Sequence, residues 1–182
     1  MTKGVKIGIT GLPSAGKTQT LLKVIEMLQD EDMIVGGMIT EPIIKKGKRL
    51  GFRIKDWLNK KEGILAHVDL ESKVRVGKYG VNIANIEKIG VNAIEDATQR
   101  AEVIVVDEVG KIEVESEKFI EAVKKALDTD KSIILTLHKK SRNPLLQEIR
   151  RRDDVRILEV TPVNRSLLPY KIMNLLKGKD II

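Results

Sequence analysis

Residues 11–18, GLPSAGKT, match the spacing G-x-x-x-x-G-K-[ST] completely. Before them, Val5, Ile7 and Ile9 alternate with polar or small residues, which is the period of a strand. After them, residues 21–28 carry apolar side chains at the spacing of one helix face. A glycine-rich turn between a strand and a helix presents backbone N–H groups and the positive end of the helix dipole to an anion. This stretch therefore predicts a phosphate-binding loop.

The side chains that the motif specifies have separate tasks. Gly11 and Gly16 permit backbone angles and a close approach that a Cβ atom would forbid. Lys17 is expected to reach the β- and γ-phosphates, and Thr18 is expected to offer its hydroxyl to Mg²⁺. We therefore predict that Lys17 is catalytic and that Thr18 is a metal ligand.

A second, acidic motif follows a continuous apolar run at residues 103–106. Such a run is typical of a strand that is covered on both faces. It ends in Asp107 and Glu108, at the edge of an open α/β sheet where ligands collect. We predict that Asp107 binds Mg²⁺, directly or through water, and that the catalytic Glu108 holds and polarises the water that attacks the γ-phosphorus.

Four other polar residues have a functional and an ordinary interpretation, and the sequence leaves both open. Lys111, Thr136 and His138 follow or end buried strands, where they would sense the γ-phosphate charge, or they are simply solvated. Tyr79 lies between Gly77 and Gly80 and either stacks on a base or packs as a normal turn residue. A zinc site at His138 is excluded because no second histidine or cysteine stands at ligand spacing.

Residues 40–57 predict a basic β-hairpin, because a Lys-Lys-Gly-Lys turn separates two apolar arms. Its cations are either a solvated edge that discourages strand pairing or a flap over a nucleotide, with Arg49 or Arg53 on phosphate. An arginine that stabilises transferring phosphate could also be Arg142, Arg165 or a residue of a partner chain.

The composition bounds the remaining possibilities. With 182 residues, the chain predicts one domain over residues 1–182. The chain has no cysteine, so disulfides and thiolate catalysis are excluded. We expect no signal peptide, no membrane contact and a cytoplasmic location, since the first strand begins at once and no apolar run is long enough to span a bilayer. The abundance of Lys and Glu resembles heat-adapted proteins.

Strands alternate with helices along the whole chain, which predicts an α/β fold. We expect a three-layer P-loop NTPase fold, with a mostly parallel sheet, helices on both faces and a β-hairpin insertion near residues 40–57. The Glu after the Asp of the second motif favours the catalytic-glutamate subclass, in which another strand lies between the two motif strands.

Five segments together resemble one family: TGLPSAGKT, TEPIIKKGKRLGF, VGKYGVN, VVDEVGKIE and VTPVNR. They resemble the nucleoside-triphosphatase family of archaea and some bacteria, which animals have as a cancer-related nucleoside-triphosphatase. The resemblance covers nearly the full length and implies slow, Mg²⁺-dependent hydrolysis of several nucleoside triphosphates to diphosphates, with Glu108 as general base. Ser14-Ala15 departs from it, because a glycine is frequent there. The nucleotide contacts that it implies are Gly11, Leu12, Pro13, Ser14, Ala15, Gly16, Lys17, Thr18, Val103, Ile104, Val105, Val106, Asp107, Glu108, Val109 and Gly110.

The sequence is also compatible with two functions other than hydrolysis. A nucleotide or polynucleotide kinase fits the size and the loop, although no Arg-rich lid is visible late in the chain. A nucleic-acid-binding module regulated by ATP fits the net charge of +7, but it is not favoured because this charge is spread out. The base preference and the oligomeric state stay open, with a monomer as the expectation.

Overall fold

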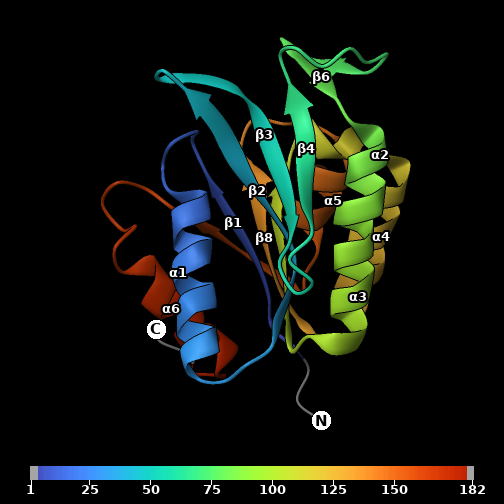
Figure 1. The fold of residues 1–182 in the computed structure, drawn as a ribbon. Helices are drawn as coiled ribbons and strands as arrows, with labels where there is room; N and C mark the ends of the chain where they lie inside the picture. The colour runs from blue at the N-terminus through green and yellow to red at the C-terminus, as the bar shows by residue number, and fades with distance from the viewer. Residues whose placement is uncertain (1–3, 180–182) are drawn as a thin grey trace.

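The computed structural model describes residues 4–179. In this range, one nine-stranded sheet has the strand order β5-β6-β4-β3-β2-β7-β8-β1-β9 (Figure 1). The strands are β1 (Lys6–Gly11), β2 (Val35–Lys45), β3 (Lys48–Asp56), β4 (Glu62–His67), β5 (Arg75–Val76), β6 (Tyr79–Val81), β7 (Val103–Val109), β8 (Ser132–His138) and β9 (Val155–Glu159). The helices are α1 (Lys17–Asp30), α2 (Ile83–Asn85), a π-helical segment (Ile86–Val91), α3 (Asn92–Arg100), a 3₁₀ turn (Glu113–Glu115), α4 (Glu117–Leu127), α5 (Pro144–Arg151) and α6 (Leu168–Leu176).

The parallel part of the sheet is β2-β7-β8-β1-β9, and it contains both predicted motif strands. β8 lies between β1 and β7, so the predicted intervening strand is confirmed. The apolar run at residues 103–106 is buried on both faces, as its lack of alternation indicated. Because these strands are parallel, the residues that follow β1, β7 and β8 meet at one edge.

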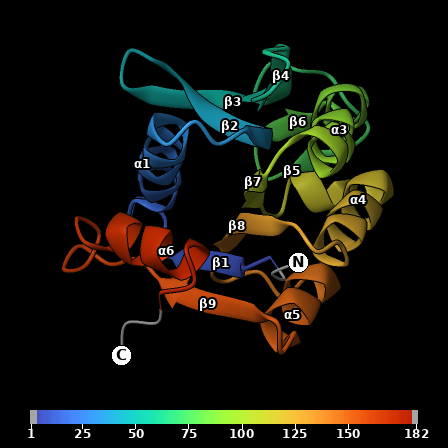
Figure 2. The ribbon, with the colours of Figure 1, turned by 90° about the horizontal axis from the view of Figure 1, so that it is seen from below.

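Helices cover both faces, which confirms the expected layers. α1 and α6 lie on one face, whereas α3, α4 and α5 lie on the other (Figure 2). Two apolar clusters correspond to these interfaces, one around Phe119 and one around Leu21. None of the helices in residues 4–179 is both long and apolar enough to cross a bilayer.

The predicted hairpin is β2 and β3, joined by a turn at Lys46 and Gly47. β2 pairs parallel with β7 over residues 35–38 and antiparallel with β3 over residues 38–45, so the hairpin extends the central sheet. Gly37 allows this close pairing, since a Cβ atom there would lie 1.9 Å from the carbonyl oxygen of Val105. The hairpin and β6 project at the same end of the sheet as the N-terminus of α1 (Figure 1).

Residues 58–82, between the hairpin and the next helical segment, contain β4 and the small strands β5 and β6. Helical structure then begins at Ile83, because the Asn82 side chain accepts a hydrogen bond from the backbone N–H of Asn85 at 2.9 Å. A π-helical turn then seats Gly90 against Ile54 of β3, where a Cβ atom would be 2.9 Å from the methyl carbon.

Candidate active site

The predicted phosphate loop joins β1 to α1 at the carboxyl edge of the sheet. Gly16 takes the left-handed conformation at φ 108°, and α1 begins at Lys17, the next residue. No side chain caps the first turn of α1, so its first N–H groups are available to an anion. Gly11 is needed for packing, because a Cβ atom there would lie 2.9 Å from the carbonyl oxygen of Val160. Local geometry therefore matches the motif.

Lys17 and Glu108 lie together, although 91 positions separate them in the sequence. The ammonium group of Lys17 is 2.7 Å from Oε2 of Glu108, and it donates a 3.3 Å hydrogen bond to the carbonyl oxygen of Leu137. Both side chains are only partly exposed, so this ion pair is weakly screened by solvent. The two motifs thus share one site.

Asp107 ends the apolar part of β7 and accepts two hydrogen bonds from hydroxyl groups. Thr18 donates to Oδ2 at 3.0 Å, and Thr136 of β8 donates to Oδ1 at 2.6 Å. Asp107 is only 1% exposed, and this burial raises the pKa of its carboxyl group to about 6, against the opposing effect of the hydroxyl donors. The peptide bond between Asp107 and Glu108 is cis. Thr136 therefore fixes the carboxylate and does not face solvent.

Glu113 is a further acid of the site, and the sequence analysis missed its role. A Cβ atom on Gly110 would lie 2.8 Å from Oε1 of Glu108 and 3.2 Å from Oε2 of Glu113, so both carboxyl groups approach this glycine. Glu113 is only 4% exposed, and burial, followed by the charge of Glu108, raises its pKa well above the usual value. Its place in the segment VGKIE was visible, but periodicity does not reveal the burial of a single residue in a 3₁₀ turn.

His138 and Lys111 stand at the margin of the site. Nδ1 of His138 is buried and has no hydrogen-bond partner among the residues that the structure describes. Burial lowers the pKa of His138, which favours its neutral form at pH 7. Lys111 is exposed. Arg150 reaches back from α5 and donates to the carbonyl oxygens of His138 and Ser141 at 2.6 and 3.0 Å, so this arginine fixes the loop after β8.

In the basic hairpin, Arg49 and Lys55 contact neighbouring side chains. The guanidinium group of Arg49 lies 5.5 Å from the centre of the Phe52 ring, and Lys55 pairs with Glu41 and Glu62 at 3.8 Å each. Tyr79 packs edge-on against Phe52, with ring centres 5.4 Å apart. The ordinary interpretation of Tyr79, side-chain packing, accounts for its position.

Arg165 is the predicted arginine that the structure places beside the phosphate loop. A Cβ atom on Gly16 would lie 3.8 Å from Cδ of Arg165. In the second motif, by contrast, the side chains of residues 103–106 are buried in the sheet, so they support Asp107 from behind.

Comparisons with known proteins agree with this geometry. The family model described as NTPase matches residues 6–173. The chain is 39% identical to a nucleoside-triphosphatase THEP1 of Picrophilus torridus, over 97% of this chain and 98% of the relative. It is 44% identical to a nucleoside-triphosphatase THEP1 of a Thermotoga species, over 95% of this chain and 96% of the relative.

Two solved structures have the same fold. The crystal structure of THEP1 from the hyperthermophile Aquifex aeolicus superposes with a TM-score of 0.84 at 33% identity, over 95% of this chain and 99% of that chain. The solution structure of a human cancer-related nucleoside triphosphatase gives a TM-score of 0.81 at 33% identity, over 97% and 100%. The expected P-loop fold and the family resemblance are therefore confirmed, and the chain belongs to the NTPase family.

Proposed function

We propose that this protein hydrolyses nucleoside 5′-triphosphates to diphosphates and phosphate, with Mg²⁺ and with little preference among bases. The observation that carries the proposal is the 2.7 Å pairing of Lys17 with Glu108 at the N-terminus of α1. It joins a phosphate-binding group to a group that activates water. Relatives named nucleoside-triphosphatases, aligned over nearly the whole chain, support the same activity.

Mg²⁺ fits the residues present. The hydroxyl of Thr18 and the carboxylate of Asp107 are hard oxygen donors 3.0 Å apart. Among residues 4–179, no group of three His, Cys, Asp or Glu side chains forms a metal cage. Such a sparse donor set suits Mg²⁺, which takes one or two protein ligands and completes its shell with water and substrate phosphates. When bound, Mg²⁺ would neutralise charge on the β- and γ-phosphates.

Lys17 and Glu108 would act in sequence. With no nucleotide, the carboxylate of Glu108 is the partner of the Lys17 ammonium group. A triphosphate in the loop would compete for Lys17, because its oxygens carry more negative charge than one carboxylate. Glu108 would then be free to orient a water molecule and accept its proton as the water oxygen bonds to the γ-phosphorus. The bond between this phosphorus and the β–γ bridging oxygen breaks, and the diphosphate leaves.

The remaining nucleotide contacts follow from position. We propose that residues 11–18 surround the phosphates through backbone N–H groups and that residues 107–110 approach the γ-phosphate, while the buried residues 103–106 hold the strand in place. We also propose that residues 1–182 act as one domain, because both motifs and the hairpin belong to one sheet. The lack of cysteine suits a cytoplasmic location.

The test is phosphate release from the common nucleoside triphosphates. Glu108→Gln should slow release at least tenfold, on the order of 1.4 kcal/mol in the barrier, while nucleotide binding persists. Glu148→Gln, at an exposed glutamate paired with Lys124, is the matched control and should retain wild-type activity. Full activity in Glu108→Gln would remove Glu108 from the mechanism.

The same assay distinguishes hydrolysis from phosphate transfer to another nucleotide. Nucleoside monophosphates are added with ATP, and the products are separated by chromatography. Hydrolysis predicts free phosphate at an unchanged rate. Formation of new diphosphate in step with ATP loss would instead identify a kinase.

A further inference from the structure

A groove of about 330 Å³ adjoins the phosphate loop, and Ser14 and Gly16 of the loop are among the residues that line it. Four segments form it: the loop itself, the first turns of α1, the connection from β9 into α6, and the first turn of α6. In Figure 1, this connection lies beside the upper half of α1. The residues that matter for its chemistry are Ser14, Gly16, Gln19, Lys23, Arg165 and Tyr170. Because Ser14 and Gly16 belong to the loop, the groove begins next to the place proposed for the phosphates.

Arg165 stands in this groove on a rigid support. Asn164 accepts a 2.8 Å hydrogen bond from the backbone N–H of Thr161 and donates one of 2.8 Å to the carbonyl oxygen of Glu159. The backbone N–H of Arg165 also donates to the carbonyl oxygen of Thr161 at 3.0 Å. The guanidinium group, by contrast, has no hydrogen-bond or ion-pair partner within residues 4–179. The fold thus holds a planar cation beside the phosphate loop without using it internally.

Tyr170 supplies a second flat surface. It lies on the first turn of α6, is 54% exposed, and belongs to the same groove. An exposed aromatic side chain beside a free guanidinium is a combination on which nucleobases stack, because both groups are planar. Gln19 and Ser14 add neutral donors and acceptors, which suit a ribose or a base edge.

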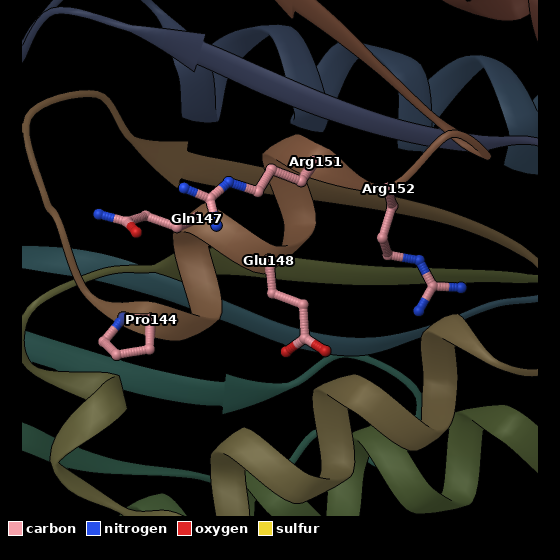
Figure 3. A pocket seen from close by; sticks show the side chains of 5 residues that line it. All are labelled: Pro144, Gln147, Glu148, Arg151 and Arg152. Carbon is pink, nitrogen blue, oxygen red and sulfur yellow. The ribbon is translucent and has the colours of Figure 1, made fainter.

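A second groove, elsewhere on the molecule, lacks these properties. It lies along α5 and is lined by Pro144, Gln147, Glu148, Arg151 and Arg152 (Figure 3). The guanidinium group of Arg152 is already engaged by Asp128 and Asp154 at 2.9–3.0 Å. A carboxylate, Glu148, faces the same space and would repel a nucleotide phosphate. No residue of the phosphate loop lines it.

We infer that the groove beside the phosphate loop binds the nucleoside, with the base against the guanidinium plane of Arg165 and the ring of Tyr170. This inference rests on the proposed function, because it assigns the nucleoside part of the same substrate. Stacking does not read the edges of a base, so one groove accepts purines and pyrimidines alike. Arg165 is therefore a binding residue for the nucleoside, and the low base preference has a physical cause.

The experiment compares two ligands that differ only by a nucleoside. Dissociation constants for ADP and for pyrophosphate are measured by calorimetry, with Mg²⁺, on wild type and on Arg165→Ala. ADP affinity should fall on the order of tenfold, whereas pyrophosphate affinity should change by less than about twofold. GDP, CDP and UDP should lose affinity by similar factors. Arg151→Ala, in the other groove, is the matched control and should change neither constant.

Two further variants separate stacking from charge. Arg165→Lys keeps the charge but loses the plane, so its ADP affinity should resemble that of Arg165→Ala. Tyr170→Ala should weaken ADP binding severalfold, and Tyr170→Phe should restore it. Equal losses for ADP and pyrophosphate would make Arg165 a phosphate ligand and overturn the inference, as would unchanged ADP binding. Since binding is measured directly, failure of hydrolysis in the wild type would reject the proposed function alone.

Discussion

Two clusters of charged side chains lie at opposite ends of the parallel strands, and they are built differently. The cluster at the carboxyl ends consists of Lys17, Asp107, Glu108 and Glu113. The cluster at the amino ends consists of Lys6, Asp128, Arg152 and Asp154. In the second cluster every acid contacts a cation: Arg152 holds Asp154 through two hydrogen bonds of 2.9 Å and Asp128 at 3.0 Å, and Lys6 lies 3.4 Å from Asp154.

The pKa directions express the difference. Hydrogen bonds with Arg152 hold the pKa of Asp154 well below its ordinary value, and those same bonds raise the pKa of Arg152. At the other end, burial raises the pKa of Asp107 to about 6 and holds the pKa of Glu113 well above its ordinary value. The cluster at the amino ends therefore stabilises the ionised forms of its side chains. The cluster at the carboxyl ends has more carboxyl groups than the single cation of Lys17 can balance. A protein tolerates such an excess where a cationic ligand is to be bound.

The largest expected effect comes from the lysines of the two clusters. Lys17→Ala should lower the rate of phosphate release on the order of 100-fold, because one charged donor to the transferring phosphoryl group is lost. Lys6→Ala removes a buried lysine from the other end, so it should lower the melting temperature and leave the rate per folded molecule intact. Single-turnover phosphate release measures the rate of each variant, and thermal melts measure its melting temperature. If Lys17→Ala kept more than a tenth of the activity, the two clusters would not differ in function.

The next effect concerns the hydroxyl that Thr136 donates to Asp107. Thr136→Val keeps the shape and removes the donor, so unfolding free energy at pH 8 should drop by about 2 kcal/mol. The loss should shrink below pH 6, because Asp107 is then protonated and needs the donor less. Guanidinium unfolding without metal, at pH 5 and pH 8, measures this difference. Thr136→Ser retains the hydroxyl and should behave as wild type, and an equal loss at both pH values would contradict the account.

Glu113 sharpens the comparison through the pH dependence of stability. Folding raises the pKa of Glu113. Its contribution to the free energy of unfolding is therefore complete below the unfolded pKa of about 4.3 and is lost as pH rises through the folded pKa. Glu113→Gln is neutral at every pH and should raise the melting temperature at pH 8 by roughly 2–4 °C, with little change at pH 4. Glu121→Gln, at an exposed position, is the control. A lower melting temperature of Glu113→Gln at pH 8 would mean that the carboxylate is ionised and stabilising.

The smallest effect is expected for Asp154, whose pKa moves the opposite way. Its stabilisation is complete above the unfolded pKa of about 3.9 and is lost progressively as pH falls from that value toward the much lower folded pKa. Since the side chain is one-third exposed, Asp154→Asn should cost about 1 kcal/mol at pH 7 and progressively less as the pH falls below about 3.9. Urea unfolding across this range measures it. Phosphate release should stay unchanged, and a slower rate would link the two clusters.

Much of the fold was predictable because its signals are local. The phosphate loop and the apolar run before Asp107 each depend on neighbours within a few residues, and the structure contains both. The hairpin was equally visible from its turn. The strand between β1 and β7 followed from the subclass that the acidic pair Asp107-Glu108 indicates.

Other features were not predictable, because distant segments create them. Glu113 is an ordinary polar residue until Gly110 lets its carboxyl group approach that of Glu108. No local pattern specifies that Arg150 fixes the loop after β8 or that Arg152 joins α5 to Asp128. Arg165 was one of several arginine candidates, and only its position over Gly16 distinguishes it.

The sequence by itself determined the family and the kind of chemistry that we propose, since a glycine-rich loop with Lys17 and Thr18, and an acid pair after a buried strand, indicate groups suited to phosphate, metal and water. The tertiary structure alone decided how these groups share charge. Burial and pKa depend on what surrounds a carboxyl group in space, and parallel strands bring together residues about 90 positions apart. Only the packed sheet, with β8 between β1 and β7, places Thr136 on Asp107, Lys17 on Glu108, and Arg165 beside the loop.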